Sequence, residues 1–211
     1  MRLVIFGSSG MVGQGVLREA LRDGRVSQVT TLVRSASGRT HPKLREIVHA
    51  NVLALEGLDL ACDACAFAIG VSSTGLSEEA YARVTYEMAL AVARAVLSPT
   101  TTFVYVSGAG AEGSSMWARV KRRAEQDLQA LPFARVYVFR PAFIQPLHGI
   151  KSRTPLYNAL YTVLRPLTGL VPSRFRTTTE RVGRAVLNVA IEGYEKSILE
   201  SADIEDAARA R

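Results

Sequence analysis

Short apolar runs alternate with stretches of helical periodicity along the first 140 residues of the chain. Runs that are largely apolar occupy residues 3–6, 29–33, 64–69, 102–106 and 136–139, and a weaker one occupies 46–48. Helical patterns fill residues 11–21, 77–97 and 115–131. Strands that do not alternate with polar residues are typical of a sheet covered on both faces. We therefore predict an α/β fold with a doubly wound, mostly parallel sheet and right-handed crossovers.

This rhythm changes after Pro141. Residues 141–176 contain five of the eight prolines, and a helical stripe lies there among basic residues: Leu156, Tyr157, Leu160, Tyr161 and Leu164. The stripe fits a lid over a substrate pocket, plain core packing, a helix lying on a membrane or a protein interface, and we favour a lid or core packing. Beyond it we expect a helix over 177–191 with Thr179 as its cap, a short strand at 197–199 and a terminal helix at 203–209.

The domain prediction follows from this pattern. We find no internal repeat and no low-complexity linker, so we expect one domain over residues 1–211. Its cofactor-binding core would span 1–145. The C-terminal helical extension, 146–211, would form the lid or substrate segment.

Composition is that of an ordinary globular protein. The chain has 211 residues, 48% of them hydrophobic, and a net charge of +7. Positive charge favours acidic partners such as phosphorylated cofactors, but it is spread along the chain apart from residues 119–123, so we do not expect nucleic-acid binding. No apolar run reaches the ~18 residues of a membrane span, and no signal-peptide pattern is present. We expect a cytoplasmic monomer or homodimer.

Cysteine and histidine do not indicate a metal site. Cys62 and Cys65 have the spacing of a redox dithiol or of half a zinc site. Cys65, however, opens an apolar run, where a free cysteine usually behaves as a small hydrophobic residue. The three histidines are scattered along the chain. We therefore interpret Cys65 as a core thiol and expect no metal.

A glycine-rich turn joins the first strand to the first helix. It reads Gly7-Ser8-Ser9-Gly10-Met11-Val12-Gly13. Gly7 would permit a tight turn, Gly10 would let the backbone approach a pyrophosphate, and Gly13 would let helix and strand pack closely. The helix N-terminus adds free amides and the positive end of a dipole, and the serines add hydroxyl donors. The turn predicts a dinucleotide site.

The end of the second strand bears on which dinucleotide is bound. An acidic residue there would bind the ribose 2′-hydroxyl of NAD. This chain has Leu32-Val33-Arg34-Ser35 instead. Because Arg34 can pair with a 2′-phosphate and no neighbouring residue of this stretch is acidic, we favour NADP(H) over NAD(H).

Together these features resemble a known family. The glycine turn, Arg34, Ser107 at the end of a strand, Lys121 on the next helix and Arg140-Pro141-Ala142 look like a short-chain dehydrogenase/reductase. The GxxGxxG spacing and the short chain point to the atypical NAD(P)H-binding, NmrA-like and epimerase-related branch. The similarity covers residues 1–145 well and the remainder loosely.

The resemblance implies roles for individual residues. Ser107 matches the serine that hydrogen-bonds the substrate carbonyl, and Lys121 matches the lysine that holds the nicotinamide ribose and lowers the pKa of a tyrosine. Further cofactor contacts are expected by position at Asn51, Ala68, Ile69, Gly70, Pro141, Ala142 and Phe143.

Two positions depart from the family pattern. The catalytic tyrosine should lie four residues before Lys121, where this chain has Trp117. An indole N–H donates a hydrogen bond but does not titrate usefully, so it cannot relay a proton. Thr85 stands about where many relatives carry an asparagine that orders a water. Candidate replacements for the missing acid are Tyr81, Tyr86 and Tyr105, of which we expect Tyr105 on the same strand face as Ser107.

Two functional hypotheses remain. One is an oxidoreductase that reduces a small carbonyl compound, with Ser107 and Lys121 placing substrate and cofactor. The other is a non-catalytic NADP(H)-sensing regulatory or assembly protein, which Trp117 favours.

Overall fold

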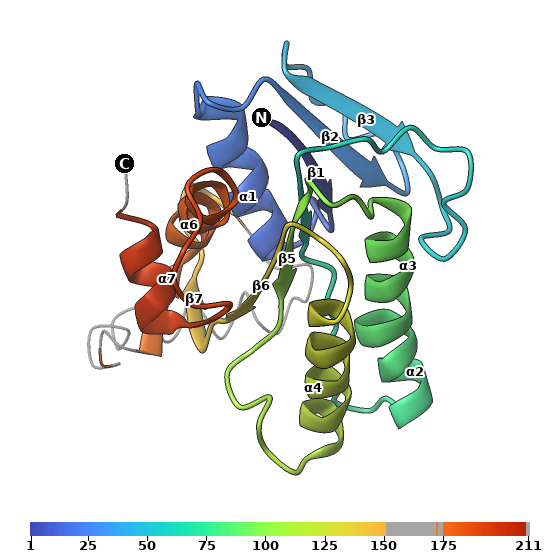
Figure 1. Ribbon diagram of the computed structural model, residues 1–211, viewed down its shortest axis with the longest axis vertical. Coiled ribbons are helices and arrows are strands. Elements are labelled where there is room, and N and C mark those ends of the chain that lie inside the picture. The colour runs from blue at the N-terminus through green and yellow to red at the C-terminus, as the bar shows by residue number, and fades with distance from the viewer. Residues whose placement is uncertain (151–171, 173–174, 210–211) are drawn as a thin grey trace.

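Seven parallel strands form the central sheet of this computed structural model, which describes residues 1–150, 172 and 175–209 (Figure 1). Their order across the sheet is β3-β2-β1-β4-β5-β6-β9. The strands are β1 (Arg2–Phe6), β2 (Gln28–Val33), β3 (Leu44–Val48), β4 (Ala64–Phe67), β5 (Thr102–Val106), β6 (Arg135–Arg140) and β9 (Ile198–Glu200). The order reverses direction between β1 and β4. The doubly wound parallel sheet predicted from the sequence is confirmed.

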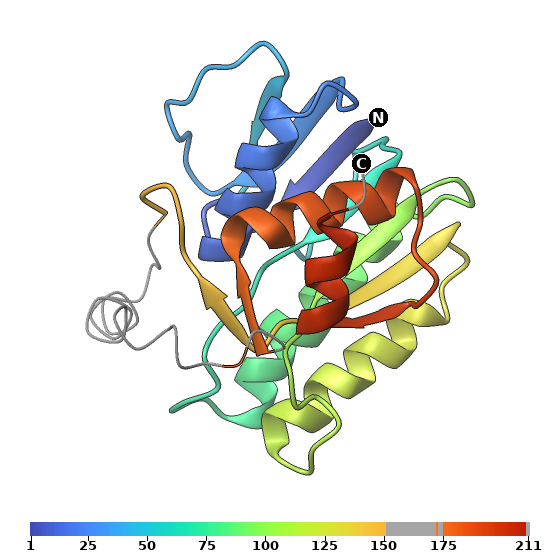
Figure 2. The ribbon, with the colours of Figure 1, turned by 90° about the vertical axis from the view of Figure 1, so that its left-hand side faces the viewer.

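Helices cover both faces of the sheet (Figures 1 and 2). One face carries α1 (Met11–Arg22), α6 (Thr179–Ile191) and α7 (Ser201–Ala207). The other carries α2 (Glu78–Ala82), η1 (Arg83–Glu87), α3 (Met88–Ala95) and α4 (Met116–Gln129). Alternate residues of β1 enter the two resulting cores: Leu3 and Ile5 pack under α1 and α6, whereas Val4 and Phe6 pack under α3 and α4. This two-sided burial explains why the strands are apolar almost throughout.

The helix expected over residues 77–97 is interrupted by a π turn, η1. Ser77 caps its start, where the Ser77 side chain accepts a hydrogen bond from the amide of Ala80. Within the π turn, the buried carbonyl of Thr85 accepts a hydrogen bond from the Tyr105 hydroxyl at 3.1 Å. Such turns are rare insertions into α-helices and often occur near functional sites.

The C-terminal region differs from expectation in its details. Thr178, rather than Thr179, caps α6, and its side chain accepts from the amide of Arg181. Thr178 also ends β8 (Arg176–Thr178), which pairs with β7 (Phe143–Gln145) in a small second sheet. The terminal helix starts at Ser201, two residues earlier than predicted. The Leu/Tyr stripe at 156–164 lies outside the described residues.

Two glycines allow α1 and α6 to cross at close range. A Cβ atom on Gly15 would lie 2.3 Å from the carbonyl oxygen of Thr179, and one on Gly183 would lie 2.7 Å from the carbonyl oxygen of Gly15. Neither distance is compatible with a side chain. This crossing fixes α6 against α1, the helix that follows the glycine turn.

Candidate dinucleotide and substrate site

The glycine turn has the geometry that its spacing predicts. Gly7 has φ +87°, a conformation that favours glycine, and a Cβ there would lie 2.6 Å from the main chain of Ala68. A Cβ on Gly13 would lie 2.1 Å from the carbonyl oxygen of Gly7. These two glycines therefore join β1, β4 and α1 at distances that no side chain permits.

The turn presents main-chain donors at the start of α1. A Cβ on Gly10 would meet only two oxygens within 4 Å, the nearer at 3.3 Å. Gly10 precedes α1 without a side-chain cap, and the amides of Met11 and Val12 have no acceptor among the described residues. Ser8 is buried and Ser9 is exposed. Free amides at a helix start suit phosphate oxygens, so the turn fits a pyrophosphate.

Arg34 follows β2 directly and projects as an exposed side chain. Within the part of the chain that the structure describes, it makes no hydrogen bond or ion pair. The carboxylate of Glu46, on β3, accepts instead from the amide and hydroxyl of Ser37 at 3.0 and 2.6 Å. Asn51 lies in the exposed loop after β3, where its side-chain oxygen accepts from the amide of Leu53. The Arg34 guanidinium is thus free to meet an anion.

The remaining predicted positions gather at the carboxyl edge of the sheet. The amide of Ala68 donates to Phe6 at 2.9 Å, and that of Ser107 donates to Phe139 at 2.7 Å. Beyond them, Ile69 is half-buried and Gly70 is exposed. Open α/β sheets bind ligands at this edge, where the strand order reverses.

Pro141, Ala142 and Phe143 follow β6 at the same edge. The carbonyl of Pro141 accepts from the amide of Ala109 at 3.1 Å, and the amide of Ala142 donates to the Ser201 hydroxyl at 2.9 Å. Phe143 is half-buried at the start of β7. The three residues therefore tie the loop after β5 to the C-terminal helix.

Ser107 belongs to a buried polar network that sequence reasoning missed. Its hydroxyl donates to the carboxylate of Glu125, which is 2% exposed. Arg140 contacts the same carboxylate through Nη2 at 2.6 Å and Nε at 3.2 Å, and it also reaches Glu112 at 2.7 Å. The hydrogen bond to Glu125 raises the pKa of Arg140 above its usual range. The sequence held one indication of this network: Glu125 lies four residues after Lys121 and thus on the same helix face.

Lys121 lies under the loop that follows Ser107. Its Cε is 3.8 Å from the position of a Cβ on Gly108, and its Nζ is 5.9 Å from the centroid of the Tyr105 ring. No described residue forms a hydrogen bond or ion pair with its ammonium group. Burial lowers the pKa of Lys121 to about 8, with the Glu125 carboxylate opposing that shift.

Trp117 occupies the next position along the same face of α4. Its ring is half-buried and would come within 3.2 Å of a Cβ on Gly110, which has φ +86°. Trp117, Lys121 and Glu125 are spaced four residues apart, so they form one stripe facing the loop 107–110. The indole thus lines the candidate site.

The tyrosines do not replace the missing acid. Tyr105 is buried with its hydroxyl bonded to Thr85, and burial raises its pKa well above the usual range. Burial also raises the pKa of Tyr81. Tyr86 instead donates to Asp127 at 2.6 Å, under the Arg123 guanidinium. The speculation that Tyr105 supplies a proton is not supported.

Cysteine chemistry is equally disfavoured. Cys62 and Cys65 are both free and buried, and burial raises the pKa of Cys62 to about 12.

Across the described residues there is no group of three or more His, Cys, Asp or Glu side chains that could hold a metal ion. None of the helices described is long and apolar enough to span a membrane.

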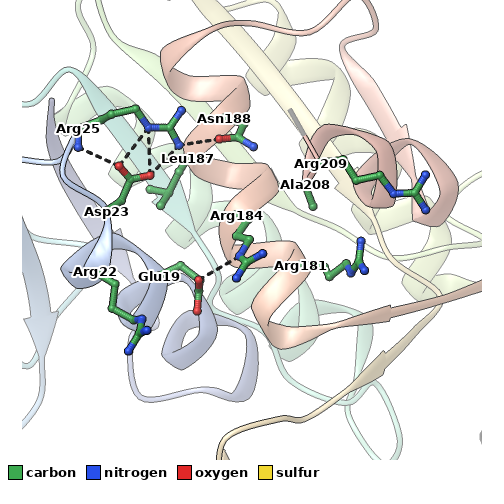
Figure 3. A pocket seen from close by; sticks show the side chains of 10 residues that line it. All are labelled: Glu19, Arg22, Asp23, Arg25, Arg181, Arg184, Leu187, Asn188, Ala208 and Arg209. Atoms are coloured by element: carbon green, nitrogen blue, oxygen red, sulfur yellow. Dashed lines mark hydrogen bonds and ion pairs between the residues drawn. The ribbon is translucent and has the colours of Figure 1, made fainter. Parts of the chain in front are cut away.

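A separate cavity of about 570 Å³ opens between α1, α6 and α7, away from the glycine turn (Figure 3). Arginines line it, but most are paired: Arg25 with Asp23 and Glu192, Arg184 with Glu19 and Glu180, and Arg181 with Glu205. Of its arginines, Arg22 and Arg209 lack a carboxylate partner within the described chain. Its charges hold the three helices together and do not mark it as the dinucleotide site.

The fold is that of the short-chain dehydrogenase/reductase and epimerase structures to which this chain is similar. A short-chain dehydrogenase/reductase from Burkholderia thailandensis superposes with a TM-score of 0.70 at 16% identity, over 95% of this chain and 90% of that one. A human epimerase family protein with NADPH gives 0.67 at 15%, over 95% and 73%. The Bordetella bronchiseptica enzyme WbmH in complex with NAD+ gives 0.66 at 19%, over 94% and 74%.

Relatives similar in sequence carry one name. Protein FMP52, mitochondrial, of Chaetomium globosum is 24% identical over 95% of this chain and 94% of its own. Protein FMP52-1, mitochondrial, of Scheffersomyces stipitis is 26% identical over 93% and 91%. No family model matches the chain.

The expected cytoplasmic location is contradicted by these relatives. Five curated relatives match across 88–95% of the chain, and each is named as a mitochondrial protein. The expectation rested on the lack of a recognisable targeting pattern. No feature of the sequence supported a cytoplasmic location directly. Such a default does not outweigh the names of full-length relatives.

Proposed function

We propose that this protein binds NADP(H) across the carboxyl edge of its sheet. The glycine turn would hold the pyrophosphate on the free amides of Met11 and Val12, with Gly10 leaving room for its approach. Structures of similar fold hold NADPH or NAD+, which supports a dinucleotide without deciding between the two. The residues of the candidate site fit a bound dinucleotide.

The preference for the phosphorylated cofactor rests on Arg34. Its guanidinium is exposed and unpaired among the described residues, at the strand end where the adenosine ribose lies in such folds. A 2′-phosphate would gain a charge-assisted pair there, whereas a 2′-hydroxyl would gain little.

We further propose that the protein is an oxidoreductase acting on a small carbonyl compound. The observation that carries this proposal is the half-buried Lys121 beside the loop 107–110, whose ammonium group forms no hydrogen bond or ion pair with any described residue. A partly buried cation that no carboxylate pairs directly costs stability, and Lys121 lies at the edge where substrates bind in this architecture. NADPH would supply hydride chemistry when bound; Trp117 and Ser107 would border the substrate.

A second candidate function is a non-catalytic NADP(H)-binding protein. Trp117 favours it, because an indole cannot relay a proton. The Ser107 hydroxyl favours it too, since its hydrogen is donated to Glu125 and not towards a ligand.

Turnover separates the two candidates. NADPH oxidation should be followed against a panel of small aldehydes and ketones, together with direct measurement of NADPH binding. We expect carbonyl-dependent oxidation above the protein-free rate. Saturable binding without turnover on any member of the panel would contradict the oxidoreductase and support the binding protein.

A further inference from the structure

Reduction of a carbonyl requires a proton as well as a hydride. In this chain the residue four positions before Lys121 is Trp117, which has no proton to give near neutral pH. If the proposed function holds, another group must protonate the developing alkoxide. This requirement for a proton donor rests on the proposed function.

Ser107 is poorly placed to be that group. Its hydroxyl donates to Glu125, whose carboxylate also accepts from Arg140. Glu125 and Arg140 are 2% and 5% exposed, so turning the hydroxyl away would leave buried acceptor capacity unsatisfied. Ser107 is therefore held as part of the wall of the site.

Lys121 has the opposite environment. Its ammonium has three N–H donors, and no described residue accepts from them. The side chain passes within 3.8 Å of a Cβ position on Gly108, and Trp117 closes the neighbouring space against Gly110. We propose that the Lys121 ammonium is the proton donor to the substrate carbonyl oxygen, in the role that a tyrosine would otherwise fill.

The groups around Lys121 are compatible with that role. Glu125 faces it from the next turn of α4, but Ser107 and Arg140 already occupy that carboxylate. Tyr105 faces it from β5 through its ring, and Tyr81 lies beyond Tyr105. Burial lowers the pKa of Lys121 to about 8, close to the operating pH at which general acids are most effective.

The step balances without another reactant. Bound NADPH would supply the hydride, with its two electrons, to the carbonyl carbon and would itself become NADP+. The carbonyl oxygen receives a proton from Nζ of Lys121 as the C=O π bond breaks and the O–H bond forms. The neutral lysine amine then regains a proton from water.

Lysine NMR tests this assignment without any cofactor. The chain has four lysines, at positions 43, 121, 151 and 196, so the side-chain signals can be assigned by single substitutions. We expect one signal to titrate near pH 8, to vanish in Lys121→Met and to persist in the control Lys196→Met. Titration of the Lys121 signal near the ordinary ~10.4 would overturn the proposal.

Kinetics tests the role itself. Lys121→Met should lower kcat at least about 100-fold, the lower range for a lost general acid, with a smaller change in KM for NADPH. In the unmutated protein kcat for reduction should fall as pH rises above about 8, because the donor loses its proton. Lys121→Arg, charged throughout this range, should abolish that fall.

The outcomes separate this proposal from the proposed function. Absence of turnover by the unmutated protein contradicts both. Turnover that survives in Lys121→Met, or a loss confined to KM for NADPH, contradicts the proton-donor role alone and leaves Lys121 as a ribose-binding residue.

Discussion

The environments of Glu125 and Arg140 in the structure differ from those that the sequence around them suggests. Glu125 follows the basic run 119–123 on a helix and looks like a solvated surface acid, yet it is almost fully buried against Arg140. The positions of Ser107 and Lys121 at the sheet edge were predictable from spacing. The Ser107–Glu125 hydrogen bond was not, because its partner lies 18 residues away and is identified only by packing.

The buried pair gives a stability prediction. Glu125→Gln keeps the shape but leaves Arg140 only the more exposed carboxylates of Glu112 and Glu200, so it should lower the free energy of unfolding by about 2 kcal/mol. The matched control is Glu78→Gln, which breaks an exposed pair with Arg119 at 2.9 Å and should cost less than about 1 kcal/mol. Urea denaturation measures both variants. Similar costs for the two would show that Glu125 is not held as described.

At the scale of elements, local pattern and long-range packing contribute separately. The apolar runs located the main-sheet strands, since burial on both faces makes such runs continuous. The π turn and the Thr178 cap escaped prediction, because contacts with distant parts of the chain help determine them: Tyr105 for the turn, and β7, which pairs with β8, for the cap. The close crossing at Gly15 and Gly183 was missed for the same reason, because the sequence of one helix does not show which other helix packs against it.

The glycine turn predicts two different defects. Gly13→Ala should destabilise the fold by about 1–3 kcal/mol or more, because its methyl would overlap the Gly7 carbonyl. Gly10→Ala should fold, since a Cβ there would lie 3.3 Å from its nearest neighbour, but it should bind NADPH at least about tenfold more weakly, because its methyl would keep the pyrophosphate from the backbone. Thermal unfolding and calorimetric titration measure the two effects.

Gly24→Ala is the control for that pair. No heavy atom lies within 4 Å of a Cβ there, so both stability and binding should be preserved. Unchanged NADPH affinity in Gly10→Ala would mean that the pyrophosphate does not approach this turn.

For the whole molecule, the reversal of strand order between β1 and β4 brings together residues from distant parts of the chain. The same edge of the sheet then carries the turn after β1, Arg34 after β2, and Ser107 and Lys121 after β5. Sequence reasoning reached this arrangement because parallel strands end on the same side. The order of the strands and the small β7–β8 sheet required the structure, since they depend on pairings between distant segments.

The most direct test of the central claim is a titration of the single tryptophan, Trp117, with NADPH and NADH. Because the indole lines the candidate site, bound cofactor should change its emission saturably. We predict NADPH affinity at least about tenfold above that for NADH, lost in Arg34→Ala and kept in the control Arg22→Ala. Equal affinities in the unmutated protein would contradict the role of Arg34. No saturable response, with no binding by calorimetry, would contradict the dinucleotide site itself.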